Sequence, residues 1–294
     1  MDGAVILDKP AGITSFGAVR RVRSLIGGGK VGHVGTLDPL GTGVLPMLVG
    51  RATRLARFYL GHEREYVSGI RFGWATTTYD RDGEAVREPV DVDLERPVVE
   101  ELLATYRGTL SQVPPQVSAK KVDGVRAYKL ARKRRPVRLD PVSVEIRELE
   151  LLEVDGSLAV VRCLCSAGTY IRSLAHDLGQ EMGCGAHVAS LRRTLVGEFS
   201  LENAHTLESL ESMRKAGRIE EAVLSPLALL PDIPVHRVNA VEAAHIRHGR
   251  DFRISPFSSC SDAKMVKAVG PDNRLLCLGK AQVPRMYHPF VVFA

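Results

Sequence analysis

The sequence predicts an α+β fold, because strand patterns and helix patterns occur in separate parts of the chain. Residues 66–74 alternate between two faces, as a half-buried strand does. Residues 158–165 form an almost continuous apolar run, which predicts a strand buried on both faces. Residues 94–106 instead repeat apolar side chains at helical spacing. A chain of 294 residues is long enough for one large domain and a small one.

The chain opens with a predicted strand at Val5-Ile6-Leu7, which turn-forming residues end at Lys9 to Gly12. Thr14 or Ser15 can then cap a helix that three glycines stop at residues 27–29. Further on, arginines recur at every third position, which more often marks a solvated helix face than a phosphate clamp; they are Arg51, Arg54 and Arg57.

Residues 32–46 are rich in glycine and show neither helical nor strand period. They carry one carboxylate, Asp38, between the apolar Leu37 and the rigid Pro39. Glycines let a backbone approach a ligand closely, which favours a site, but Asp, Gly and Pro are also ordinary turn residues. The preceding Gly29-Lys30 lacks the Ser or Thr of a phosphate loop, so a nucleoside triphosphate site is excluded.

The segment from Lys120 to Arg138 is one-sided in charge. It holds nine basic residues and one acid, with Tyr128 interleaved. A solvated helix would balance its lysines with acids, whereas a strip of one sign suits binding along a phosphate backbone. The net charge of +6 also favours a polyanionic partner.

The apolar run at 158–165 leads into a helix that Thr169 can cap, with one apolar stripe on its surface; the stripe is Ile171, Leu174, Leu178 and Met182. Tyr170 and Arg172 lie in the first turn, away from that stripe. An arginine at a helix start is disfavoured by the helix dipole, and a nearby carboxylate would offset this.

Prolines at 231 and 234 indicate a linker, after which short apolar segments predict a small β-rich module; the segments are 265–269, 275–280 and 290–293. The N-terminus lacks a signal peptide pattern, and no apolar stretch reaches the ~20 residues of a membrane helix. Five cysteines, an odd number without zinc spacing, predict reduced thiols and a cytoplasmic location.

Several motifs, in the same order, are similar to those of the TruB family of tRNA pseudouridine synthases. The first two are Leu7-Asp8-Lys9-Pro10-Ala11-Gly12 and the central run Gly32 to Pro46. The others are Arg64-Glu65-Tyr66, Thr76 to Gly83, Pro114 to Lys121, Cys165 to Arg172 and Leu191-Arg192-Arg193-Thr194. One departure is Gly41, where many members carry alanine. The blocks span about the first two hundred residues, so chance similarity is excluded.

The resemblance implies a catalytic domain at 1–231 with a central mixed, largely antiparallel sheet flanked by helices. It also implies an RNA-binding insertion at about 120–138 and a PUA-like RNA-binding domain at 232–294. The implied activity is conversion of uridine to pseudouridine in the T loop of tRNA, usually at position 55, without metal or other cofactor. A monomer is the expected state.

The same resemblance assigns roles to individual residues. Asp38 would be the nucleophile, acting at C1′ or through a sugar-derived intermediate, and Arg172 would be its ion-pair partner. Tyr66 would stack on the flipped base and help remove the C5 proton. The residues implied to bind substrate or support the pocket are His33, Tyr170, Lys9, Asp80, Lys120, Arg132, Lys133 and Arg134.

Two other functions are compatible with parts of this pattern. The basic strip and the C-terminal segment would also suit an RNA-binding or tRNA-folding module in which catalysis is dispensable. A glycoside-type hydrolase could use Asp38, but the sequence lacks a clear second catalytic carboxylate.

Neutralising the basic strip tests whether it contacts RNA. Replacing Arg132, Lys133, Arg134 and Arg135 with glutamine should weaken RNA binding and flatten the dependence of affinity on salt, because fewer counterions would be released. The measurement is the dissociation constant at several salt concentrations. An unaltered slope would show that the strip is only a solvated surface.

Overall fold

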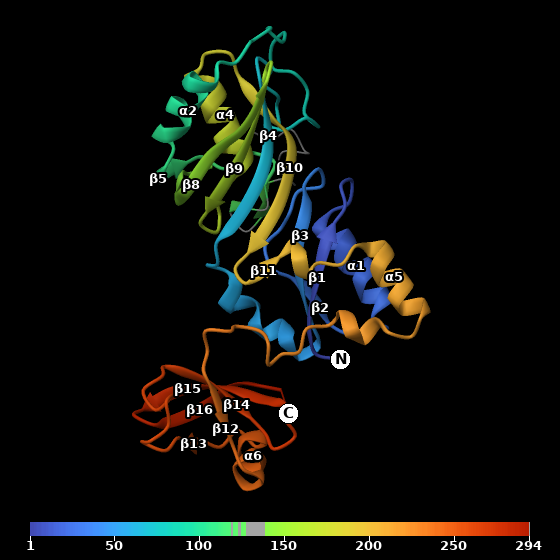
Figure 1. Ribbon diagram of the computed structural model, residues 1–294, viewed down its shortest axis with the longest axis vertical. Helices are drawn as coiled ribbons and strands as arrows, with labels where there is room; N and C mark the ends of the chain where they lie inside the picture. The colour runs from blue at the N-terminus through green and yellow to red at the C-terminus, as the bar shows by residue number, and fades with distance from the viewer. Residues whose placement is uncertain (119, 123–124, 128–138, 294) are drawn as a thin grey trace.

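The computed structural model describes residues 1–118, 120–122, 125–127 and 139–293. These residues form an elongated molecule with three parts along its long axis (Figure 1). One end holds most of a large sheet with two helices. The first strands of the chain, with α1 and α5, lie in the middle, and a separate small sheet with one helix forms the other end.

The large sheet has nine strands within the described residues. Its order is β1 (Gly3–Lys9), β3 (Thr42–Val49), β10 (Ala186–Val196), β4 (Arg64–Phe72), β9 (Leu158–Cys165), β8 (Val142–Asp155) and β5 (Gly108–Gln112). Two short strands lie off this path: β2 (Val31–His33) pairs with β3, and β11 (Phe199–Ser200) pairs with β10. The pairing of β3 with β10 is parallel and the other described pairings in this sheet are antiparallel, so the predicted mixed, largely antiparallel sheet is confirmed.

Helices cover the sheet in two places. α2 (Arg96–Thr105) and α4 (Ile171–Glu181) bury apolar side chains against β4, β8 and β9. α1 (Ser15–Leu25) and α5 (Leu207–Lys215) pack against β1 and β3 in a second core. Thr14 caps α1, as one of the two residues predicted to do so, by accepting the N–H of Gly17. No helix in the described ranges is long and apolar enough to cross a membrane.

The prediction that residues 158–165 are buried on both faces is wrong. In β9, alternate side chains from Ala159 to Cys165 are buried, whereas the intervening ones are half-exposed. On the open face, Arg162 pairs with three carboxylates, at 3.1 Å from Glu65, 3.1 Å from Glu148 and 2.8 Å from Glu150. The apolar run therefore did not reveal that one face of this strand has no helix covering it.

Shorter elements connect these layers. They are η1 (Gly50–Tyr59), β6 (Lys121–Val122), β7 (Val125–Arg126), η2 (Leu201–Asn203) and η3 (Ile219–Ala222). β6 and β7 pair antiparallel within the predicted insertion. Residues 123, 124 and 128–138 of that insertion, which include Arg132, Lys133 and Arg134, lie outside the described residues.

The C-terminal segment is β-rich, as predicted. Its sheet has the order β12 (Val235–Arg237), β14 (Met265–Val269), β15 (Leu275–Val283), β16 (Met286–Val292) and β13 (Phe252–Arg253), with α6 (Ala240–Arg247) packed beside it. A capping box between Asn239 and Glu242 starts α6. The domain boundary at 231/232 and the PUA-like assignment stay predictions.

The arginines of η1 join this small sheet to the rest of the molecule. Arg54 donates to the carbonyl of Val292 at 2.9 Å, and Arg51 donates to the carbonyl of Phe293. The guanidinium of Arg57 lies 4.0 Å from the ring centroid of Phe290. The three arginines are exposed, as on the solvated helix face that the sequence favours, but they also contact the end of the chain.

Removing one of these contacts should loosen the small sheet. Arg57→Ala deletes a cation–π contact and should lower stability by about 1 kcal/mol, with faster proteolysis in the linker 231–234. Limited proteolysis and urea unfolding measure both effects. Arg274→Ala is the control, because the Arg274 side chain is 85% exposed within the same sheet. Equal effects of the two variants would contradict the contact's importance.

Candidate active site

The loop that carries Asp38 is held at both ends by the sheet. It runs from β2 to β3, and its Val34 N–H donates to the carbonyl of Pro46 at 2.9 Å. Gly43, just after the loop, has φ of +100°, and a Cβ there would lie 2.1 Å from the carbonyl oxygen of Arg193. Only glycine fits where β3 comes this close to β10.

The start of α1 holds the loop from the other side. The hydroxyl of Ser15 donates to the carbonyl of Leu37 at 2.8 Å and accepts the N–H of Leu37 at 2.9 Å. The N–H of Gly12 donates to the carbonyl of Pro39 at 2.8 Å. Backbone on both sides of Asp38 is thus fixed, while the Asp38 side chain itself stays 33% exposed.

Arg172 meets Asp38, and the expected ion pair is confirmed. The guanidinium Nε lies 2.9 Å from Asp38 Oδ2, and the arginine side chain is only 4% exposed. Arg172 is in the first turn of α4, whose N-cap is Tyr170 and not the predicted Thr169. Thr169 instead donates its hydroxyl to the carbonyl of Ser166, inside the turn that precedes the helix.

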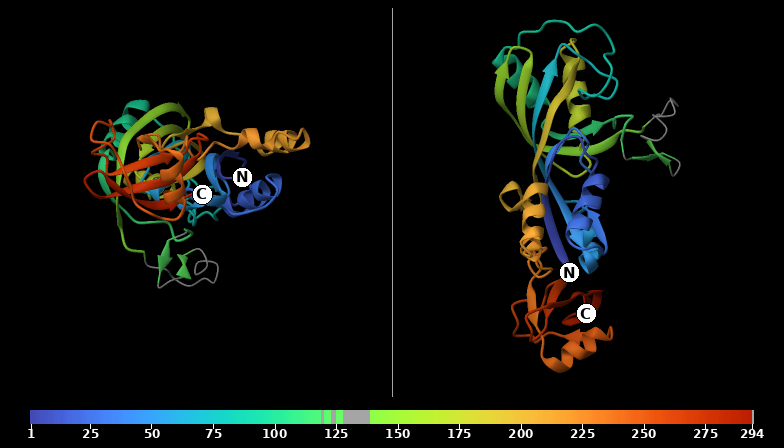
Figure 2. Two further views of the ribbon diagram at one scale, coloured as in Figure 1. Left: turned by 90° about the horizontal axis from the view of Figure 1, so that it is seen from below. Right: turned by 90° about the vertical axis from the view of Figure 1, so that its right-hand side faces the viewer.

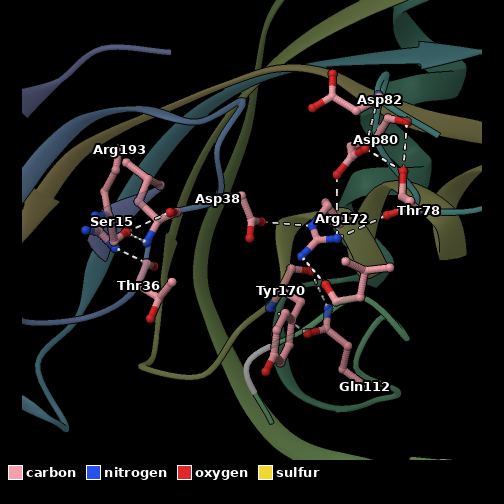
Figure 3. A network of polar contacts seen from close by, with 12 residues as sticks. Ser15, Thr36, Asp38, Thr78, Asp80, Asp82, Gln112, Tyr170, Arg172 and Arg193 are labelled. Atoms are coloured by element: carbon pink, nitrogen blue, oxygen red, sulfur yellow. Dashed lines mark hydrogen bonds and ion pairs between the residues drawn. The ribbon is translucent and has the colours of Figure 1, made fainter. Parts of the chain in front are cut away.

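Further acceptors surround the Arg172 guanidinium (Figure 3). Its Nη atoms donate to the carbonyls of Thr78 at 3.2 Å and Val117 at 2.9 Å, and Asp80 Oδ2 lies 3.5 Å away. Burial raises the pKa of Asp80, while a hydrogen bond from the Thr78 hydroxyl and the charge of Arg172 oppose that rise. The two carboxylates offset the unfavourable position of an arginine at a helix start.

The ion pair lies at a cleft of about 220 Å³. Its lining is Gly35, Thr36, Leu37, Asp38, Arg64, Tyr66, Ser118, Gly168, Thr169, Tyr170, Ile171, Arg172 and Leu191. The structure therefore brings together four predicted site residues from distant parts of the chain: Asp38, Tyr66, Tyr170 and Arg172. Gln112 secures Tyr170 by accepting its N–H at 2.7 Å and donating to its carbonyl at 3.0 Å.

Tyr66 is buried in the cleft wall beside Arg193. Burial raises the pKa of the Tyr66 phenol, and the charge of Arg193 opposes the rise. Arg193 is fully buried and donates to three carbonyls of the central loop and β3: Gly35 and Thr36, each at 3.2 Å, and Val44 at 2.8 Å. One side chain thus links β10, the loop and Tyr66.

The other described residues of the predicted site lie outside the cleft lining. Lys9 is fully buried beneath the loop, where Nζ donates to the carbonyls of Pro10, Ile13 and Pro39. Burial lowers the pKa of Lys9 to about 8, and the charge of Asp38 opposes this. His33 is half-buried in β2, and Lys120 donates to the carbonyl of Asp140 at 2.9 Å.

Sequence reasoning assigned no role to several residues that build the site. Arg193 belongs to a matched motif, and strand alternation would have placed it opposite Arg192, on the inner face. Arg64 and Ser118 also belong to matched motifs, but nothing further in the sequence gave them a role at the cleft. Gln112 had no signal of its own, because only the folded chain brings it to Tyr170. Across the described residues, no group of three or more His, Cys, Asp and Glu side chains could hold a metal.

An arginine-paired aspartate in a cleft of an α+β sheet defines a site for covalent or acid–base chemistry. Residues 23–171 match the N-terminal domain of the TruB family pseudouridylate synthases, and residues 172–231 match the tRNA pseudouridylate synthase B C-terminal domain. Asp38 falls in the first match and Arg172 begins the second. The chain belongs to the TruB family of pseudouridylate synthases.

Individual relatives agree with this assignment. A tRNA pseudouridine synthase B of Solibacter usitatus is 50% identical over 292 residues, which are 99% of this chain and 100% of the relative. That of Stutzerimonas stutzeri is 44% identical over 86% of this chain and 84% of the relative. A chain of an H/ACA RNP bound to a substrate RNA containing 2'-deoxyuridine shares the fold, with a TM-score of 0.72 at 24% identity over 99% of this chain and 85% of that one.

Arg193 should matter for stability far more than its neighbour. Arg193→Met leaves three carbonyls without their donor and should lower the free energy of unfolding by about 3 kcal/mol. Arg192→Met is the matched control, because Arg192 is 42% exposed and pairs with Asp8 at 2.8 Å; its loss should cost at most about 1 kcal/mol. Urea unfolding of both variants measures the difference, and equal losses would refute the argument.

Proposed function

We propose that this protein converts a uridine of tRNA to pseudouridine, and that its target lies in the T loop, at position 55. Membership of the TruB family and relatives that are tRNA pseudouridine synthases B over nearly the full chain support the reaction. The observation that carries the proposal is the pairing of Asp38 with the buried Arg172 at an open cleft. The basic strip and the β-rich C-terminal segment support RNA as the partner.

The target base must leave its stack to reach Asp38, which costs a few kcal/mol. A cleft of about 220 Å³ accommodates a base and not a duplex. A uridine in a folded RNA loop is the cheapest to extrude, because the loop already strains its stacking. We therefore favour a stem-loop that the protein recognises largely by shape.

The reaction breaks the bond from N1 to C1′ and makes one from C5 to C1′. As the first bond breaks, its electron pair leaves with the base as a uracil anion, and the Asp38 carboxylate bonds to C1′ or takes up a proton of the ribose. After the uracil turns, C5 forms the new bond to C1′. On the first route the bond from C1′ to Asp38 breaks in this step and its electron pair returns to the carboxylate; on the second route Asp38 gives its proton back to the ribose. A proton acceptor then removes the proton from C5, and the uracil ring regains its conjugation.

Arg172 supports this chemistry through Asp38. Its Nε lies 2.9 Å from one carboxylate oxygen of Asp38, and this charge-assisted contact orients the carboxylate. The carbonyls of Thr78 and Val117, together with Asp80, keep the guanidinium from turning away. Arg172 is thus a positioning residue for the nucleophile, and Asp80 positions Arg172.

Tyr66 and Tyr170 flank the place where the base would lie. The neutral phenol of Tyr66, whose pKa burial raises, favours stacking on the base over removal of the C5 proton. Tyr170 would support the opposite wall. Lys9 and His33 would act from beside the cleft, with Lys9 holding the loop backbone and His33 contacting nucleotides displaced by the flipped base.

The protein would act as a monomer in the cytoplasm. One described chain supplies Asp38, Tyr66, Tyr170 and Arg172, so the cleft needs no second copy. All five cysteines are unpaired thiols, and four of them are buried, which suits a reducing compartment.

Asp38→Asn tests the proposal, since an amide cannot act as the nucleophile. The variant should make no detectable pseudouridine in a T stem-loop transcript yet bind it with nearly the affinity of the parent. Mass spectrometry or chemical mapping of pseudouridine measures the product, and filter binding measures the affinity. Product formation at the parental rate would reject Asp38 as the nucleophile, and an active parent that leaves the T loop unmodified would reject the target.

A further inference from the structure

The stretch that leads to the nucleophile is free of acidic residues. Between Asp8 and Asp38 the sequence holds no aspartate or glutamate, but it holds Lys9, Arg20, Arg21, Arg23 and Lys30. Lys9 is buried under the loop, whereas the three arginines lie on the exposed side of α1. An exposed positive face therefore adjoins the cleft without belonging to its lining.

This outer face of α1 carries a groove. Its lining is Ile13, Thr14, Gly17, Arg20, Arg21 and Ser24, around a volume of about 480 Å³. The neighbouring Phe16 is 66% exposed, and the guanidinium of Arg20 lies 5.5 Å from its ring centroid. Contact with the ring restrains Arg20, which lowers the entropy that the side chain would lose on binding a ligand.

Helix stability explains only part of this charge. Arg23, in the last turn of α1, favourably faces the negative end of the helix dipole. Arg20 and Arg21 lie earlier, and α1 contains no acid to pair with them. From the packed neighbour α5, Glu208 interacts with Arg21 and partly offsets its charge. The positive face is therefore suited to an anion from outside the chain.

The groove begins next to the residue that holds the loop of Asp38, because its lining residue Thr14 directly precedes Ser15. Ser15, at the first turn of α1, holds Leu37 next to Asp38, and Arg20 follows about 8 Å further along the helix axis. The right-hand view of Figure 2 shows α1 (blue) in the middle part of the molecule, and the left-hand view shows α1 and the strands β6 and β7 (green) on different sides of it. An RNA whose uridine enters the cleft would have this face within reach of its backbone.

We propose that the outer face of α1 binds phosphates of the RNA stem next to the flipped uridine, with Arg20 and Arg21 as the charged donors. This rests on the proposed function, because it takes the RNA to be the one whose uridine meets Asp38. Guanidinium groups donate two parallel hydrogen bonds to a phosphate, and the hydroxyls of Thr14 and Ser24 supply further donors along the groove. Such contacts set the register of the stem without reading its sequence.

Binding by catalytically inert protein separates this proposal from the chemistry. In the full chain carrying Asp38→Asn, Arg20→Gln with Arg21→Gln should weaken binding of a T stem-loop transcript about tenfold at roughly 0.1 M salt. It should also reduce the slope of log affinity against log salt concentration by about one to two. The matched control is Arg71→Gln with Arg218→Gln, two exposed arginines in β4 and before η3. Unchanged binding, or equal losses in both pairs, would overturn the proposal.

A crosslink gives a second measurement that does not depend on affinity. A benzophenone amino acid introduced in place of Phe16 should crosslink to stem nucleotides of the same transcript, whereas one in place of Val98, a 49% exposed residue of α2, should not. No crosslink from position 16, or equal crosslinking from both positions, would overturn the proposal. A different result would refute the proposed function, namely the absence of pseudouridine in RNA treated with the unmodified protein.

Discussion

The ion pair between Asp38 and Arg172 is the contact on which the rest of the site depends. A guanidinium that is 4% exposed has lost most of its water, and it is stable there only if acceptors replace that water. The fold supplies them from three separate segments: Asp38 from the loop before β3, Thr78 and Asp80 from the turn after β4, and Val117 from the approach to the insertion. Arg172 therefore fastens these segments together while it aims the carboxylate.

The same logic explains why the loop is rigid although it is rich in glycine. Ser15 and Gly12 hold the backbone beside Asp38 from the α1 side, and Arg193 holds three carbonyls from the β10 side. Gly43 allows β3 to approach β10 closely enough for this. A carboxylate fixed in this way needs little reorganisation when substrate arrives, which is how a preorganised site lowers a barrier.

The arrangement also separates two uses of positive charge. Arg172 and Arg193 are buried, and they act on the protein's own carboxylate and carbonyls. Arg20 and Arg21 are exposed on α1, along the groove that begins next to Ser15. The arginines of η1 are also exposed, but they contact the last strand of the chain. The residue type alone therefore does not decide which role an arginine has.

The sequence by itself determined much of this protein. Strand alternation at 66–74, helical spacing at 94–106 and the short apolar segments after residue 235 are local patterns, so they predicted the corresponding strands, helices and β-rich end. The motifs around Asp38, Tyr66 and Arg172 resemble those of one family, so they predicted that these three residues meet. These predictions were possible because each rests either on the spacing of residues within one element or on a complete motif that resembles the family's.

Only the tertiary structure decided which faces are covered and which distant groups meet. The apolar run at 158–165 predicted a strand buried on both faces. In the structure no helix covers one face of this strand, and Arg162 pairs with three carboxylates there. Arg51, Arg54 and Arg57 are exposed, as predicted, but nothing local to them predicted their contacts with the end of the chain. Gln112 carries no local pattern for a site, and the motifs that contain Arg193 and Ser118 do not show which groups these side chains contact. Burial and long-range hydrogen bonds are properties of pairs of segments, and no single segment's sequence contains them.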